Sequence, residues 1–234
     1  QIMISRVGTD SRQIEVGELF VALAGERFDA HDFLSDVAKV GVGGVLISQQ
    51  DKCPANLAAI CVPDTRIGLG ELAAAWRAKY PIPLVLVTGS NGKTTVKEMI
   101  ASIFKAAVGE DCTLVTNGNL NNEIGLPLTL LKLRSTDRLA VVELGMNHPG
   151  ETAVLAAIAQ ANIALINNAQ REHQEFMASV EAVAIENGAV IKNLPANGCA
   201  VFPADDVYTP LWTSYAGSRR ILSFGLDEQA KVRC

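Results

Sequence analysis

The sequence contains no apolar run that approaches the roughly 18–20 residues required for a membrane-spanning helix. No charged-then-apolar leader follows Gln1, so we expect no signal peptide, no membrane association and a cytoplasmic location. Basic residues are also few, with 20 Lys and Arg against 25 Asp and Glu in 234 residues, a net charge of -5. This balance argues against broad nucleic-acid binding but allows a local basic site for a phosphorylated small molecule.

Cysteine and aromatic residues are sparse as well. The five cysteines are scattered without a Cys-x-x-Cys pair, which favours reduced thiols over a zinc site or a disulfide framework. Aromatic residues make up only 5%, which argues against a stacking platform for single-stranded nucleic acid. The remaining composition is that of a globular protein, with 49% apolar residues and enough length for one large domain or two small ones.

Short β-branched runs alternate with longer amphipathic segments along the whole chain. This alternation predicts an α/β fold with crossover units and a mostly parallel sheet flanked by helices. Runs such as LVLVT and LAVVEL are apolar throughout, as in strands covered on both faces. The predicted strands are 19–23, 44–48, 58–62, 83–88, 112–116, 139–144, 162–167, 199–202 and 220–224. The predicted helices are 32–40, 65–80, 93–107, 150–160 and 179–193.

A domain boundary is predicted near residues 79–83. Pro81 and Pro83 follow the predicted helix 65–80 and disfavour its continuation, so they bracket a short extended link. We therefore predict a small N-terminal α/β domain at residues 1–80 and a second α/β domain at residues 81–234.

The second domain opens with T-G-S-N-G-K-T-T, placed between an apolar strand and a helix. Glycines allow backbone amides to surround phosphate oxygens, and a helix N-terminus adds positive potential. Lys93 would neutralise terminal phosphates and the Thr94 hydroxyl would bind Mg²⁺. Only two residues separate the glycines where the full phosphate-loop pattern has four, so a Gly-Lys-Thr turn at an ordinary helix start is the alternative. The predicted nucleotide-binding residues are Gly89, Ser90, Asn91, Gly92, Lys93, Thr94 and Thr95.

Three further polar clusters follow predicted strands, and a parallel sheet would bring them to the edge that carries the glycine loop. The asparagine-rich run at 117–122 predicts substrate hydrogen bonds, although turn-rich loops have the same composition. Glu143 ends an apolar strand and is interpreted as a metal ligand, with a solvated strand end as the alternative. His173 is a candidate metal ligand or a surface histidine, and His148 is first a helix-start signal.

Together these motifs resemble the Mur ligases of bacterial peptidoglycan synthesis. The resemblance rests on T-G-S-N-G-K-T-T, T-N-G-N-L-N-N-E-I-G-L-P and V-E-L-G-M-N-H-P-G-E, and in the first domain on T-D-S-R and G-E-L-F-V-A-L-A-G-E-R-F-D-A-H-D-F. It implies an enzyme, an ATP-dependent amide ligase that uses Mg²⁺ and forms an acyl phosphate. The second and third motifs favour the activity that joins D-alanyl-D-alanine to UDP-N-acetylmuramoyl-tripeptide.

The resemblance also implies roles for single residues. Lys93, Glu143 and His173 match catalytic positions, and Thr94, Glu143 and His173 match metal positions. The residues that match substrate-binding motifs are Asn119, Asn121 and Asn122 near the reacting substrate, and Ser11, Arg12 and His31 at the uridine diphosphate.

Two departures from the family accompany these matches. Several members carry a metal-bridging carbamoylated lysine on the helix after the metal histidine, whereas residues 183–189 offer only Glu186 as an acidic side chain. Either Glu186 takes over part of that work or the bridge is absent. The family also has a C-terminal domain for the amine substrate, so the resemblance implies a fragment that is truncated at both ends and inactive alone. We expect a monomer.

Three other functions compete with this interpretation. Another Mur ligase that adds an earlier residue is the nearest alternative. A folylpolyglutamate synthase-like ligase has a similar phosphate loop but no separate UDP-binding domain before it. The third alternative is not an enzyme but a nucleotide-binding switch or partition protein. Binding of a UDP-sugar peptide by residues 1–80 would indicate the ligase rather than such a protein.

Overall fold

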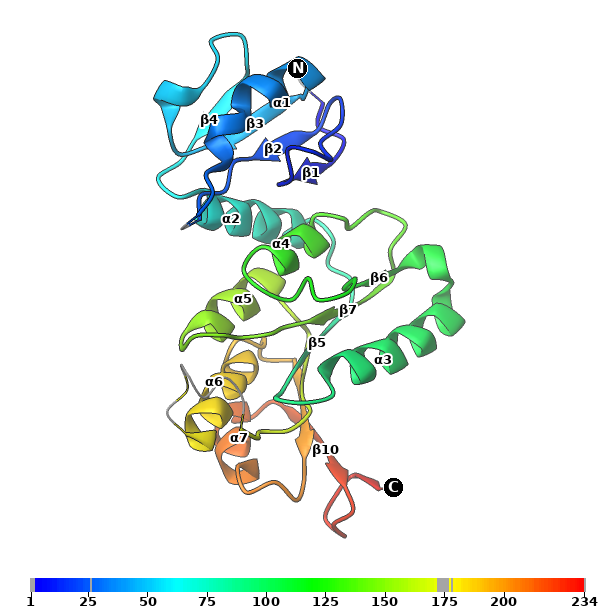
Figure 1. Ribbon diagram of the computed structural model, residues 1–234. Coiled ribbons are helices and arrows are strands. Elements are labelled where there is room, and N and C mark those ends of the chain that lie inside the picture. Colours follow the sequence, from blue (N-terminus) through cyan, green and yellow to red (C-terminus); the bar gives the residue numbers. More distant parts are fainter. Residues whose placement is uncertain (1–2, 26, 172–176, 178, 234) are drawn as a thin grey trace. The chain divides into compact units, whose positions relative to one another are not determined.

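The computed structural model describes residues 3–25, 27–171, 177 and 179–233 (Figure 1). The chain divides into two compact units, residues 1–73 (unit 1) and 74–234 (unit 2). The division falls inside α2 (Thr65–Ala78), whereas we predict the domain boundary just after this helix. Each unit contains its own parallel sheet with helices beside it, which confirms the predicted α/β class. None of the helices in these described ranges is long and apolar enough to cross a membrane.

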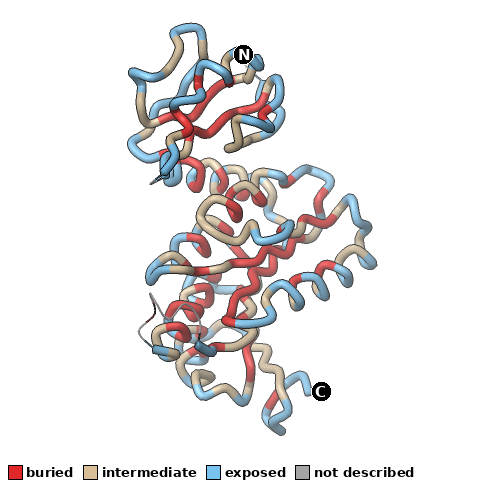
Figure 2. The backbone as a smooth tube through the Cα atoms, in the orientation of Figure 1, coloured by how far each residue is buried: buried red, intermediate tan, exposed pale blue. Residues whose placement is uncertain are grey.

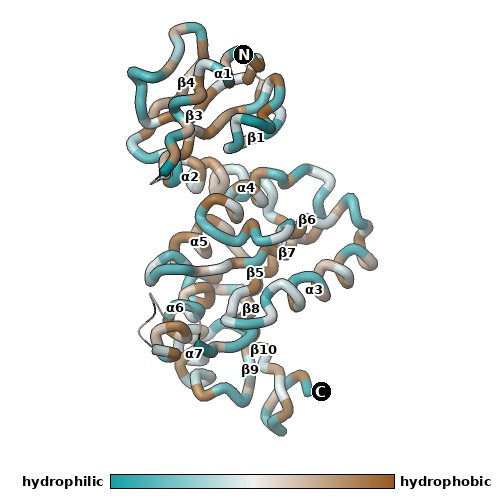
Figure 3. Tube along the Cα trace, viewed as in Figure 1, coloured by the Kyte–Doolittle hydropathy of each residue, from teal (hydrophilic) through white to brown (hydrophobic). Residues whose placement is uncertain are grey.

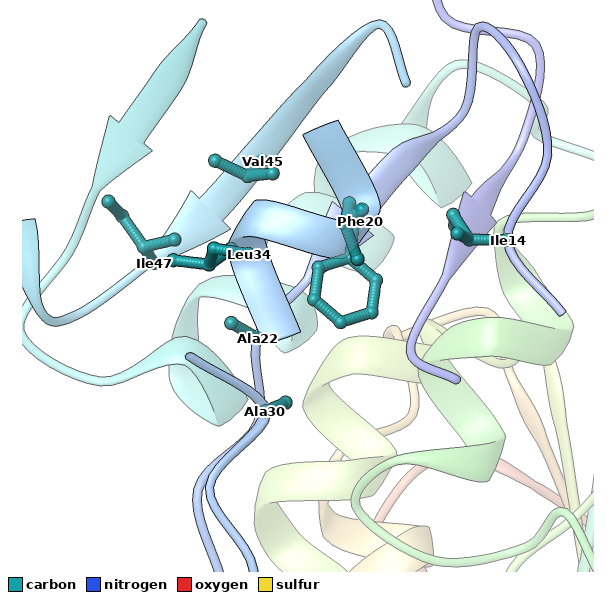
Figure 4. Packing of buried hydrophobic residues seen from close by; sticks show 8 residues of the cluster. Ile14, Phe20, Ala22, Ala30, Leu34, Val45 and Ile47 are labelled. Carbon is teal, nitrogen blue, oxygen red and sulfur yellow. The ribbon is translucent and has the colours of Figure 1, made fainter. Parts of the chain in front are cut away.

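Unit 1 contains a four-stranded sheet in the order β1-β2-β3-β4, and all of its pairings are parallel. The core forms where α1 covers this sheet, because Leu34 of the helix packs against Phe20 and Ile47 of the strands (Figure 4). The strands are β1 (Val7–Gly8), β2 (Leu19–Val21), β3 (Gly44–Ile47) and β4 (Ala59–Cys61). The helical segments are η1 (Ala30–Phe33), α1 (Leu34–Val40) and η2 (Gln50–Lys52).

Unit 2 contains a seven-stranded sheet in the order β11-β10-β9-β8-β5-β7-β6, with parallel pairing throughout. Its strands are β5 (Leu84–Thr88), β6 (Thr113–Val115), β7 (Leu139–Glu143), β8 (Ile163–Ile166), β9 (Cys199–Pro203), β10 (Arg220–Gly225) and β11 (Val232–Arg233). Its helical segments are α3 (Lys93–Val108), η3 (Glu110–Cys112), α4 (Gly125–Leu130), α5 (Glu151–Ala159), α6 (Val180–Lys192) and α7 (Thr209–Ala216).

The interior strand β5 is buried along its whole length because helices cover both faces of the sheet (Figures 2 and 3). Val85 and Val87 pack with Ala101 of α3 on one face. The next residue, Thr88, points to the opposite face, where its hydroxyl donates to Asn187 Oδ1 of α6 at 2.8 Å. This two-sided cover explains why the strand sequence lacks the polar alternation of a half-exposed strand.

Every predicted strand and helix is present within two residues at each end. Four strands and α-helices of the described ranges were missed, namely β1, β11, α4 and α7. None of the four lies between a predicted strand and the loop that follows it at the functional edge, so the predicted positions of the polar clusters are unaffected.

Candidate functional site

Four neighbouring strands of unit 2, in the order β8, β5, β7 and β6, end at one edge of the sheet. Their pairings are all parallel, so their carboxyl ends meet there. The glycine loop follows β5, the asparagine-rich run follows β6, and Glu143 ends β7. The structure therefore brings three of the predicted clusters to one edge. His173, the remaining predicted metal residue, lies outside the described residues.

The glycine loop, residues 89–92, needs glycine at both ends. Gly89 has a φ of +129°, and a Cβ there would lie 3.0 Å from backbone atoms of Asn167 and Asn168. Gly92 has a φ of +77°, and a Cβ there would lie 2.8 Å from Asn167 Nδ2. The loop thus lies against the segment after β8, with no room for a side chain at either glycine.

The side chain of Ser90 and the backbone of Asn91 attach the loop to that segment. The Ser90 hydroxyl donates to the Gln170 carbonyl at 3.1 Å and accepts from the Gln170 N–H at 2.9 Å. The Asn91 N–H donates to Asn168 Oδ1 at 3.0 Å, and Asn167 Nδ2 donates to the Asn91 carbonyl at 2.6 Å. These two predicted nucleotide-binding residues therefore fix the loop through side-chain contacts. The contribution of Gln170 was not predicted, since nothing in its local sequence marks it.

Lys93 begins α3, the helix that carries the glycine loop at its N-terminus. Its ammonium donates to the carbonyls of Gly89 at 2.6 Å and Ser90 at 3.1 Å, so it lies over the loop. Thr94 and Thr95 follow in the first turn, and both are exposed. The first N–H groups of any α-helix have no acceptor within the helix. With the positive end of the helix dipole, they form a site suited to phosphate oxygens.

Glu143 is buried at the end of β7, with only 2% of the residue exposed, so it is not a solvated strand end. Its Oε1 accepts from Asn121 Nδ2 at 2.8 Å, and its backbone N–H donates to the Thr116 hydroxyl at 2.9 Å. Its Oε2 is buried without a hydrogen-bond partner. A buried carboxylate oxygen without a donor is costly unless a cation or water satisfies it.

The donor chemistry at Glu143 fits Mg²⁺. This ion is bound by one or two protein oxygens and completes its shell with water and substrate phosphates, so it needs no large cluster of acidic residues. Consistent with this, the described part of the chain contains no group of three or more His, Cys, Asp or Glu side chains placed to hold a metal ion. The orphaned Oε2 of Glu143 and the phosphate loop on the next strand supply the kind of site that Mg²⁺ prefers.

The three predicted asparagines occupy different positions. Asn121 binds Glu143, and its carbonyl also accepts from the Gly145 N–H at 2.9 Å. Asn122 Oδ1 accepts from the Gly125 N–H at 2.9 Å, so its side chain stabilises the start of α4. Asn119, two residues before Asn121, is exposed. Only Asn121 is joined to the predicted metal ligand.

Glu186 lies on α6, and both of its carboxylate oxygens bind the start of α5. Its Oε2 accepts from the Gly150 N–H at 3.0 Å and its Oε1 from the Thr152 N–H at 2.9 Å. His148 lies in the turn before α5, where its Nδ1 is 2.9 Å from Glu151 Oε1. Burial raises the pKa of Glu151, but hydrogen bonds from the Asn147 and His148 N–H groups outweigh it and lower the pKa. Both oxygens of Glu186 therefore stabilise a helix start.

Unit 1 contains a second candidate site, a pocket of about 470 Å³. Its lining includes a two-bond ion pair in which Arg12 Nε and Nη2 donate to the two Asp10 oxygens at 2.9 and 2.8 Å. These bonds from Arg12 lower the pKa of Asp10 to about 2. The rings of Phe28 and Phe33 stack with centroids 5.2 Å apart. The lining residues are Thr9, Asp10, Ser11, Arg12, Phe28 and Phe33.

His31, the third residue predicted at this end of the substrate, is not among the pocket-lining residues. Its ring is buried, with Nδ1 2.6 Å from Asp29 Oδ1 and Nε2 accepting from the Ser48 N–H at 2.9 Å. Burial raises the pKa of Asp29, but hydrogen bonds from Lys52, His31 and Gln49 outweigh it and hold the pKa well below its usual range. His31 thus fixes the end of β3 from inside unit 1.

Comparison with known proteins agrees with this geometry. Residues 87–233 match the Mur ligase middle domain, and 95% of the chain is 44% identical to the UDP-N-acetylmuramoyl-tripeptide–D-alanyl-D-alanine ligase of Escherichia coli K12. The chain belongs to the Mur ligase family. This confirms the resemblance drawn from the glycine loop and the asparagine-rich run. The chain spans about half the length of the curated relatives it matches, 48% for the E. coli protein.

Solved structures of Mur ligases have the same fold. A crystal structure of MurF from Acinetobacter baumannii superposes with a TM-score of 0.89 at 38% identity, covering 95% of this chain and 48% of that one. MurF from Thermotoga maritima, crystallised in complex with ADP, superposes with a TM-score of 0.85 at 30% identity, covering 95% and 50%. Both matches include the phosphate-loop unit and the N-terminal unit of this Mur ligase chain.

Proposed function

We propose that the protein containing this chain is an ATP-dependent amide ligase that adds D-alanyl-D-alanine to UDP-N-acetylmuramoyl-tripeptide through an acyl phosphate. The observation that carries the proposal is the glycine loop of β5 beside the buried, half-satisfied carboxylate of Glu143 on β7. Relatives that are 44% and 40% identical bear the name of this ligase, which favours it over Mur ligases that add earlier residues. The ADP complex of the T. maritima relative supports a nucleotide at the loop.

In this proposal the loop and α3 bind the phosphates of ATP. The N–H groups of the first turn, at Lys93, Thr94 and Thr95, point along the helix axis toward the anion. The Lys93 ammonium leaves the loop carbonyls that it contacts and neutralises the terminal phosphates. Ser90 and Asn91 hold the loop in this shape through their bonds to residues 167–170. The chain therefore places fixed positive charge where an anionic carboxylate must approach an anionic phosphate.

Glu143 and Thr94 would hold Mg²⁺ in this site, and we keep His173 as a third ligand on the sequence alone. When bound, the ion neutralises charge on the phosphate oxygens during transfer. The substrate carboxylate then attacks the γ-phosphorus and ADP leaves. The amine of D-alanyl-D-alanine attacks the acyl carbon, loses a proton, and inorganic phosphate leaves as the amide forms. Asn121 fixes Glu143, and Asn119, exposed on the same segment, is proposed to contact the tripeptide end.

Unit 1 is proposed to bind the UDP end of the substrate. Arg12 supplies a guanidinium that suits a diphosphate, and Ser11 supplies a hydroxyl beside it. The stacked pair Phe28 and Phe33 offers an apolar wall to a flat ring such as uracil. His31 takes a positioning role here, because its ring nitrogens are engaged inside the unit.

Phosphate release from ATP by the full gene product tests the proposal. We expect release only when UDP-N-acetylmuramoyl-tripeptide and D-alanyl-D-alanine are both present. Release with a single amino acid in place of the dipeptide would identify a ligase of an earlier step. Turnover with a folate and glutamate would identify a folylpolyglutamate synthase-like enzyme. ATP hydrolysis at the same rate with and without the UDP-tripeptide and the dipeptide would indicate a nucleotide switch.

A further inference from the structure

Lys97 of α3 is a fully buried lysine at the functional edge, with 0% of the residue exposed. It lies one turn after Lys93, on the same side of the helix. Its ammonium donates to the Thr116 carbonyl at 2.9 Å and also contacts the carboxylate of Glu98, whose side chain is 60% exposed. A buried cation whose counter-charge lies largely in solvent is costly and is rarely retained for packing alone.

The Lys97 contact continues to the predicted metal ligand through a single residue. Thr116, also fully buried, accepts from the Glu143 N–H through its hydroxyl at 2.9 Å while its carbonyl accepts from Lys97. Glu143 is further fixed by Asn121 and leaves Oε2 without a partner. Lys97, Thr116 and Glu143 therefore join α3, the end of β6 and the end of β7 in one line of hydrogen bonds.

We propose that Lys97 is a positioning residue that holds the Glu143 carboxylate in register with the phosphate loop. The inference rests on the proposed function, because Glu143 is the Mg²⁺ ligand only within it. The loop directly precedes the helix that carries Lys97, so the bond from Lys97 to Thr116, together with the bond from Glu143 to Thr116, links the phosphate site to the end of β7. Residues that orient a metal ligand affect metal affinity without touching the metal.

Calorimetry measures the affinity for ADP as a function of Mg²⁺ concentration. The full gene product is compared with its Lys97→Met and Thr116→Val variants. Methionine keeps the length of the side chain and removes the charge and the donor, and valine removes only the Thr116 hydroxyl. We expect each substitution to raise the Mg²⁺ concentration for half-maximal enhancement at least about tenfold. Binding of the UDP-substrate should be unchanged. Because both substitutions interrupt the same line of hydrogen bonds, the double variant should show no further increase in the Mg²⁺ requirement.

Lys105→Met is the matched control, since Lys105 is on the same helix in an exposed pair with Glu110. An unchanged Mg²⁺ requirement in folded Lys97→Met overturns the inference, as does full additivity in the double variant. If Lys97→Met fails to fold, the result for Thr116→Val tests the inference. An unchanged Mg²⁺ requirement in Thr116→Val would show that Lys97 contributes only to the stability of the fold. If the ADP affinity of the wild-type protein does not depend on Mg²⁺, the metal site of the proposed function is wrong instead.

Discussion

Asn121 Nδ2 donates to Glu143 Oε1 at 2.8 Å and thereby joins the asparagine-rich run to the end of β7. The same asparagine accepts from Gly145 through its carbonyl, and a Cβ at Gly145 would lie 3.0 Å from the Asn121 side chain. Close approach of these two loops is therefore part of the site. One oxygen of Glu143 is satisfied by this contact, and the other is buried without a hydrogen-bond partner.

Asn121→Ala is expected to leave Glu143 Oε1 without its donor and the carboxylate less firmly oriented. We expect Mg²⁺-dependent phosphate release to fall about tenfold or more, with the Mg²⁺ requirement raised. Asn119→Ala is the matched variant, because Asn119 is exposed in the same run. It should leave the Mg²⁺ requirement unchanged and raise the KM for the tripeptide substrate. A Mg²⁺ curve that is identical in Asn121→Ala and wild type would argue against the metal role of Glu143.

Lys93→Ala is expected to remove the ammonium that neutralises the transferred phosphate. Loss of one such charge in a preorganised site costs at least about a hundredfold in rate. Lys93 is partly exposed, so the circular dichroism and the unfolding midpoint should stay close to wild type. Phosphate release and the circular dichroism spectrum, measured together, check this. Native-like turnover in a folded variant would remove Lys93 from the mechanism.

Gly89→Ala is expected to displace the phosphate loop. The new Cβ meets backbone atoms at 3.0 Å, and the φ of +129° disfavours any side chain. Strain of about 1–3 kcal/mol follows from the backbone alone, and the contact with the segment after β8 adds to it. Gly109→Ala separates the two effects, because Gly109 has a φ of +97° and nothing within 4 Å of its Cβ position. ADP affinity should fall in Gly89→Ala and stay unchanged in Gly109→Ala.

The strands and the loop were predictable because their signals are local. An apolar run followed by Gly-x-x-Gly-Lys-Thr needs no tertiary information to indicate a strand, a turn and a helix start. The missed α4 contains Gly125 and Pro127, which favour a turn by propensity, and it is stabilised by the Asn122 side chain. The missed strands β1 and β11 are two residues long and carry no periodicity.

The partners of buried polar side chains were not predictable from the sequence. Lys97 lies in α3, one turn after the start of the helix. The pattern of apolar residues in this helix does not reveal which face lies deepest against the sheet, so the burial of Lys97 is not predictable. Glu186 was considered for a metal because it is the only acid in its stretch, whereas its oxygens bind a helix start 34 and 36 residues earlier. Such contacts depend on which elements pack together, and only the fold supplies that information.

Arg12→Gln is expected to weaken binding of the UDP-substrate about tenfold, since one charged hydrogen-bond donor to the diphosphate is lost. Lys39→Gln, in an exposed pair with Asp36 of the same unit, should have no effect. The Arg12–Asp10 pair should not limit binding between about pH 5 and pH 8. Because the folded pKa of Asp10 is lowered, the contribution of the pair to folding stability is present above the unfolded pKa of about 3.9 and is lost as pH falls toward 2. Calorimetric titration of UDP-substrate at several pH values checks the binding, and chemical denaturation at the same pH values checks the stability.

Glu186→Gln distinguishes a structural role from a metal role at the same side chain. Glutamine has only one acceptor oxygen, so its amide would face either the Gly150 or the Thr152 N–H, and one of these donors would lose its partner. Thr152 is fully buried, and leaving its N–H unsatisfied costs about 1–3 kcal/mol, which chemical denaturation would detect as a lower free energy of unfolding. Gly150 is exposed, so its N–H can turn to water at a smaller cost. Glu71→Gln, an exposed glutamate on α2, should leave stability unchanged. The Mg²⁺ requirement of Glu186→Gln should equal that of wild type, because both oxygens of Glu186 are engaged by backbone N–H groups at the start of α5. A raised Mg²⁺ requirement with unchanged stability would instead assign Glu186 to the metal and replace the helix-start role that its two hydrogen bonds indicate.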